Sequence, residues 1–124
     1  MESSKKILLF NVKEEKKNQI EALCEELSIQ TIVIQKEQYS QPLGVLAGIK
    51  GVDKSTMPYR DREFKSDMMV FYGIDSGELD KFLEKYRENE IEPINLKAIM
   101  TFHNMFWSAK KLYNELLKEH KNLH

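Results

Sequence analysis

The segment that decides the fold is MMVFYGIDSGELDKFLEKY, residues 68–86. Its first five residues are all apolar and stop at Gly73, which predicts a strand that is buried on both faces. Asp75 and Glu78 have the spacing of a capping box, so a helix should begin there. The apolar residues of that helix recur at helical spacing and form one stripe: Leu79, Phe82, Leu83 and Tyr86.

The same pattern occurs earlier in the chain. Residues 7–10 are consecutive apolar residues, and residues 31–34 are rich in β-branched side chains, so both predict strands. Between them, residues 14–28 carry an apolar stripe at helical spacing: Ile20, Leu23, Cys24 and Leu27. We therefore expect residues 7–34 to form a strand–helix–strand unit, with a right-handed crossover between parallel strands.

Residues 94–100 alternate between polar and apolar, which predicts an edge strand that completes a second unit over 68–100. Pro42 opens a short helix of about two turns, and a final helix is expected from 104 to 121. The expected fold class is α/β: one domain over residues 1–124, with a four-stranded sheet built from two strand–helix–strand repeats plus a C-terminal helix.

Two arrangements of the units stay open. If a helix follows each strand, the result is a small three-layer parallel sheet, which the doubly buried first and third strands favour. If the second and third strands pair antiparallel, the result is an α+β ferredoxin-like split arrangement.

A long charged loop over residues 50–67 connects the two units and holds five basic and four acidic residues. Connections of this length inside one domain are uncommon and tend to be functional or mobile. Two interpretations stay open, a solvated connection without a role and a lid. In the lid interpretation, Tyr59, Arg60 and Arg62 close over an anionic ligand.

The composition excludes several classes of protein. With 41% hydrophobic and 31% charged residues, the 124-residue chain has the composition of a soluble globular protein. Its net charge of −1 lacks the basic excess of nucleic-acid-binding proteins. The apolar runs are too short for a secretory signal or a membrane helix. We therefore expect a cytoplasmic protein with neither a nucleic-acid nor a membrane partner.

Motifs for nucleotide, redox and metal chemistry are not found. Gly44 and Gly48 lack the spacing of a phosphate-binding loop, and no Gly-x-Gly-x-x-Gly follows the first strand. The single cysteine, Cys24, excludes an intramolecular disulfide, and its place on an apolar stripe predicts a buried structural thiol. His120 and His124 have metal-ligand spacing but lie at a helix end, where a histidine is ordinary. We expect no cofactor, no metal site and no identifiable catalytic residue.

The segment between the fourth strand and the last helix, residues 101–107, is the best candidate for a ligand site. It holds a histidine and the single tryptophan of the chain, and it precedes a helix whose free N–H groups attract anions. In open parallel sheets, loops at the carboxyl ends of strands line the ligand crevice, which places the ends of the first and third strands on the same rim. The alternative is that Asn104 or Thr101 only caps the helix. The candidate ligand-binding residues are Thr101, His103, Asn104, Trp107, Asn11 and Asp75.

The order of motifs in the C-terminal half resembles a small bacterial family of unknown function, DUF3783. The resemblance rests on Leu96-Lys97-Ala98-Ile99-Met100-Thr101-x-x-Asn104-x-x-Trp107 and on Gln41-Pro42-Leu43-Gly44-x-Leu46-Ala47-Gly48. It covers most of the chain and is most specific over 94–120. Phe102 stands where the family favours a proline-like residue. The resemblance implies a bacterial cytosolic protein and no particular chemistry.

Three function classes follow from the sequence. The leading one is a non-enzymatic ligand-binding or regulatory module for a small anionic ligand. The second is a small enzyme on an anionic substrate, with His103 as acid or base and Arg60 or Arg62 as clamp. The third is an assembly subunit that forms a homodimer through an aromatic edge with Trp107 and Tyr113, or through the fourth strand.

Overall fold

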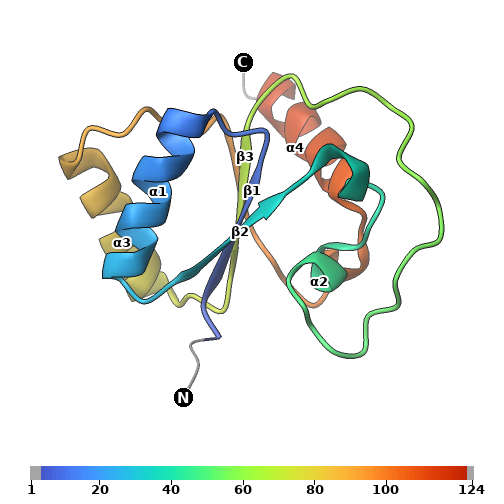
Figure 1. Cartoon of the computed structure of the whole chain (residues 1–124), viewed down its shortest axis with the longest axis horizontal. Helices are drawn as coiled ribbons and strands as arrows, with labels where there is room; N and C mark the ends of the chain where they lie inside the picture. Colours follow the sequence, from blue (N-terminus) through green and yellow to red (C-terminus); the bar gives the residue numbers. More distant parts are fainter. Residues whose placement is uncertain (1–3, 123–124) are drawn as a thin grey trace.

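Two apolar strands form the centre of the sheet in the computed structural model, which describes residues 4–122 (Figure 1). They are β1 (Lys6–Phe10) and β3 (Met68–Tyr72), which pair antiparallel with Leu8 opposite Val70. Both strands are almost fully buried, as their unbroken apolar runs predicted. The outer strands are β2 (Gln30–Ile34), parallel to β1, and β4 (Leu96–Ile99), parallel to β3. The strand order is β2-β1-β3-β4.

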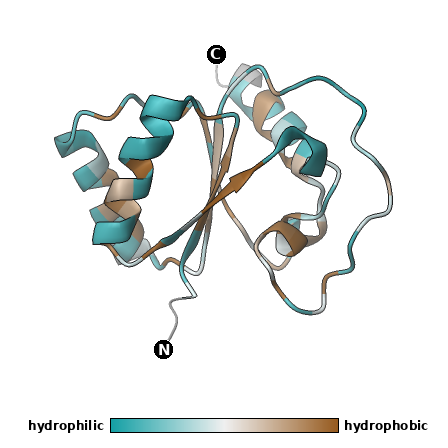
Figure 2. Ribbon diagram, viewed as in Figure 1, coloured by the Kyte–Doolittle hydropathy of each residue, from teal (hydrophilic) through white to brown (hydrophobic). Residues whose placement is uncertain are grey.

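Helices cover both faces of this sheet, so the domain has three layers (Figure 1). One face carries the two crossover helices, α1 (Glu14–Glu26) and α3 (Ser76–Glu88). The other face carries the remaining elements: η1 (Lys36–Gln38), α2 (Leu43–Leu46), η2 (Asn104–Phe106) and α4 (Ala109–Asn122). The strands are mostly hydrophobic, whereas α1, α3 and α4 carry many hydrophilic residues (Figure 2).

The predicted repeat is present, and its first two elements match without a gap. β1 and β3 start 62 residues apart, at 6 and 68, and so do α1 and α3, at 14 and 76. Two ion pairs are related by the same 62-residue spacing, and at each pair of equivalent positions a lysine in the first unit corresponds to an acidic residue in the second. Lys16 of α1 lies 2.6 Å from Asp67, and Glu78 of α3 lies 2.7 Å from Lys5. Each pair joins the first turn of one crossover helix to the residue that precedes the central strand of the other unit.

The fold class and the three layers are confirmed, but the strand directions and pairing expected in both detailed arrangements are wrong. The sheet is mixed rather than parallel, and β2 and β3 do not pair as the ferredoxin-like alternative requires. The physical reason is the path of residues 35–67. Ile34 and Met68 both lie level with Phe10, so this connection leaves and re-enters the sheet at the same end. A connection that returns to its own end of the sheet makes β3 run opposite to β1.

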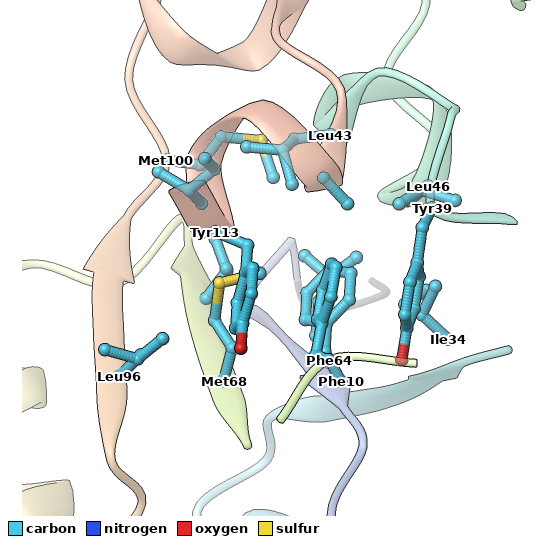
Figure 3. Close-up of a cluster of buried hydrophobic side chains, with 14 of the residues drawn as sticks. Phe10, Ile34, Tyr39, Leu43, Leu46, Phe64, Met68, Leu96, Met100 and Tyr113 are labelled. Atoms are coloured by element: carbon cyan, nitrogen blue, oxygen red, sulfur yellow. The ribbon is translucent and has the colours of Figure 1, made fainter. Parts of the chain in front are cut away.

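The 50–67 segment has no helix or strand, yet its C-terminal part is packed into the core. Phe64 is buried with its ring stacked between Tyr39 and Tyr113, each at 3.9 Å between ring centroids (Figure 3). The Tyr113 hydroxyl accepts the N–H groups of Lys65 and Ser66, at 2.9 and 3.3 Å. The aromatic stack therefore fastens the connection to α4.

The last helix begins later than predicted. Residues 104–106 form only a 3₁₀ turn, and Trp107 is extended before α4 begins at Ala109. The cap of α4 is Ser108, whose Oγ accepts the N–H of Lys111 at 3.0 Å. A backbone bridge between Pro42 and Ser108 holds the chain extended here and delays the helix.

Candidate functional site

The residues predicted to share one rim lie at opposite ends of the sheet. Asn11 follows β1, and Asp75 follows β3. Because β1 and β3 are antiparallel, with Lys6 opposite Tyr72, the carboxyl ends of these strands point in opposite directions. Asn11 is therefore separated from Asp75 and from the 101–107 segment by the length of the sheet.

Asn11 and Asp75 both have structural partners. Asn11 adopts a left-handed backbone with φ 54°, and its Nδ2 donates to the carbonyl of Phe64 at 2.6 Å. Asp75 caps α3: its Oδ1 accepts the N–H of Glu78 at 2.8 Å, and Glu78 Oε1 accepts the N–H of Asp75 at 3.1 Å. The predicted capping box is confirmed.

Thr101, His103, Asn104 and Trp107 do lie together, in one tight turn. Thr101 Oγ1 accepts the N–H groups of His103 and Asn104, at 3.2 and 3.1 Å. Asn104 Oδ1 accepts the N–H of Thr101 at 2.8 Å, and Asn104 Nδ2 donates to the carbonyl of Ile99 at 3.0 Å. The amides that were expected to attract an anion are therefore occupied by side chains of the turn itself.

The two aromatic rings of this turn contact each other, and a lysine lies over one of them. His103 is exposed and lies edge-on to the Trp107 ring, with centroids 5.3 Å apart. The Nζ of Lys111 lies 4.6 Å from the centroid of the same indole, within the range of a cation–π contact. The indole is thus covered by two neighbours from its own chain.

The lid residues lie on the α4 side of the domain. Tyr59 donates its hydroxyl to the carbonyl of Arg62 at 2.7 Å, and its ring meets Tyr39 edge-on at 5.3 Å. Arg60 and Arg62 are exposed. Tyr59 thus belongs to the aromatic packing around Tyr39.

Three exposed apolar residues lie at the end of β4 and in the turn that follows it, and the sequence interpretation missed them. We call Ile99, Phe102 and Phe106 the β4 border; their exposed fractions are 51%, 90% and 58%. Next to it lies a pocket of about 260 Å³, lined by Ile49, Tyr72, Met100, Thr101, Phe102 and Met105. Its sequence signal was the close spacing of Phe102, Phe106 and Trp107, of which Phe106 and Trp107 lie within the helix predicted over 104–121.

A second apolar pocket, the α3–β4 pocket, lies on the other face of β4. It has a volume of about 300 Å³ and is lined mainly by apolar side chains: Met69, Leu83, Tyr86, Ile91, Pro93 and Ile94. The exposed Arg87 and Lys97 complete its lining. Burial raises the pKa of Tyr86 to about 12, and its hydroxyl donates to the carbonyl of Glu92 at 2.5 Å. Tyr86 therefore lines this pocket as an uncharged side chain.

The opposite end of the sheet carries a polar pocket built on a buried ion pair. Lys16 Nζ lies 2.6 Å from Asp67 Oδ2, 3.0 Å from the carbonyl of Pro93 and 3.2 Å from Glu92 Oε1. Asp67 Oδ1 accepts two N–H groups of Asn95, at 2.8 and 3.1 Å. Burial alone lowers the pKa of Lys16, but its bonds to Asp67 and Glu92 outweigh burial and raise it. The charges and hydrogen-bonding atoms of these groups are paired with one another, so the cluster joins α1 to the residues that precede β3 and β4.

Neither a metal-binding cluster nor a membrane span stands out in the described part of the chain. Residues 4–122 contain no group of three His, Cys, Asp or Glu side chains able to hold an ion. None of the helices described is long and apolar enough to cross a bilayer. His124 lies outside the described residues.

Comparison with protein families gives one match. Residues 67–123 match Domain of unknown function (DUF3783). The resemblance noted in the sequence is thereby confirmed for the second repeat and α4, which include the β4 border. The 41–48 motif lies outside the matched range, so the resemblance covers less of the chain than expected. No curated protein and no solved structure matches significantly.

Proposed function

We propose that this chain is a non-enzymatic binding module that contacts another protein through the β4 border. One observation carries the proposal: Phe102 is 90% exposed, with Ile99 and Phe106 exposed close by in the chain. Burying apolar surface contributes about 25 cal/mol per Å², so covering a whole phenyl ring is worth about 1.5–3 kcal/mol. Phe102 also lines a pocket, and an exposed apolar group beside a pocket is a better mark of an interaction site than a single exposed residue elsewhere.

The geometry supports an apolar partner better than the small anion expected from the sequence. Thr101 Oγ1 accepts the N–H groups of His103 and Asn104, and Ser108 caps the first turn of α4. The pocket beside Phe102 has a mainly apolar lining, to which Tyr72 and Thr101 add hydroxyl groups. Such a pocket suits an aliphatic or aromatic side chain of a partner.

The proposal is tested with the apolar dye 1-anilinonaphthalene-8-sulfonate, titrated against dilute protein. Phe102→Ser removes the most exposed ring and should lower the dye fluorescence clearly. The matched control is Met57→Ser, because Met57 is 69% exposed but lies in the 50–67 segment. Equal dye binding by Phe102→Ser and the parent protein would contradict the proposal.

A further inference from the structure

The outer edge of β4 presents backbone groups that its own sheet does not use. The N–H of Leu96 donates to Asp67, and the N–H of Met100 donates to Phe71, at 3.2 and 2.8 Å. Alternate residues of a strand face the same neighbour, so Lys97 and Ile99 turn their N–H and C=O groups outward. The Ile99 carbonyl accepts one bond from Asn104 and keeps a second lone pair.

We infer that a second copy of this chain pairs with this edge, antiparallel, about a twofold axis at Ala98. The two four-stranded sheets then join into one continuous sheet. This inference rests on the proposed function, because it names the protein that the β4 border contacts.

The register follows from the positions of the side chains. An axis at Ala98 places Lys97 opposite the second copy's Ile99, and each can donate to and accept from the other. Leu96, Ala98 and Met100 pack in the core on the α4 face, so Lys97 and Ile99 project on the α3 face. The half-exposed Ile99 of each copy therefore lies beside Lys97, which lines the α3–β4 pocket of the other.

The same register brings the most exposed residue to the junction between the two copies. With Ala98 on the axis, position 102 is level with position 94 of the second copy. Phe102 lines the pocket on the α4 face, so it lies at the junction on that face, whereas Ile99 lies beside the α3–β4 pocket on the other. Each copy supplies both the exposed apolar groups and the apolar pocket, and a twofold interface requires this self-complementarity.

Charge permits a second copy in this register and argues against the nearest alternative register. The net charge of −1 causes little repulsion between copies. An axis at Lys97 would set two lysines directly opposite each other, which is destabilising, whereas an axis at Ala98 sets each lysine against an isoleucine. The other sheet edge, β2, has only Val33, 38% exposed, as an exposed large apolar side chain.

The experiment is sedimentation equilibrium of the full chain over a wide concentration range. The parent protein should dimerise. Ile99→Lys and Phe102→Ser should each raise the dissociation constant about tenfold or more, because each removes a buried apolar contact. Val33→Lys is the matched control on β2 and should dimerise like the parent. Circular dichroism checks that every variant is folded.

The register is tested by Ala98→Cys, since a residue on the axis meets its own copy at a distance that a disulfide can bridge. Oxidation should yield a covalent dimer, and its absence in a dimeric protein overturns the register. A parent that stays monomeric, or a dimer lost in Val33→Lys but kept in Ile99→Lys, overturns the inference. If a monomeric parent still binds dye through Phe102, the second copy is rejected and the proposed binding surface stands.

Discussion

Replacing Phe64 with alanine should destabilise the domain far more than its place in a coil segment suggests. The ring is buried and stacks at 3.9 Å on both Tyr39 and Tyr113. Truncating a buried phenylalanine costs about 3–5 kcal/mol. Within that total, each aromatic pair contributes about 0.5–1.5 kcal/mol. With a urea m-value of about 1–3 kcal/mol/M, the unfolding midpoint should fall by about 2 M.

The assay is urea unfolding followed by far-ultraviolet circular dichroism at low protein concentration. Phe102→Ala is the matched control, because the same ring is removed from an exposed position and should change stability by less than about 0.5 kcal/mol. Trypsin gives a second readout: cleavage after Arg60 and Arg62 should accelerate in Phe64→Ala. Equal midpoints for the two variants would refute the view that the stack fastens the connection.

Three further outcomes are expected. Because the folded-state pKa of Tyr86 is about 12, above its ordinary value of 10, stability should fall as pH rises from 10 toward 12; Tyr86→Phe should weaken this dependence in urea titrations. Lys16→Met leaves the buried Asp67 without its cation and should cost about 3–5 kcal/mol, most of which Lys16→Met/Asp67→Leu should restore. Asp75→Ala should cost about 1 kcal/mol in thermal unfolding, whereas Asp80→Ala, exposed on the same helix, should cost little.

Local pattern was sufficient for the secondary structure of both repeats. The apolar run at Met68–Tyr72 has the observed bounds of β3, and the capping box at Asp75 starts α3. These elements could be predicted because their burial and capping depend on residues close in sequence. The antiparallel centre of the sheet could not, because it depends on where residues 35–67 return to the sheet.

The ligand site at residues 101–107 was predicted from residue types alone, and those do not reveal how the segment folds. Asn104 has the residue type of a helix cap, and only the distant bridge from Pro42 shows that Ser108 takes that role. Phe106 lies within the helix predicted over 104–121, yet only a 3₁₀ turn forms there and the side chain stays exposed. Whether an apolar residue is exposed depends on which other parts of the chain cover it. Local periodicity holds no information about those distant parts.

The two ion pairs with reversed charge make the halves of this domain complementary rather than interchangeable. If two copies of the first half met through β1, Lys5 of one would approach Lys16 of the other. Two copies of the second half would bring Asp67 to Glu78. Only the pairing of unlike halves sets each cation against an anion, at 2.6 and 2.7 Å. The charges at these positions therefore disfavour contact between like halves and favour the contact between unlike halves that the fold contains.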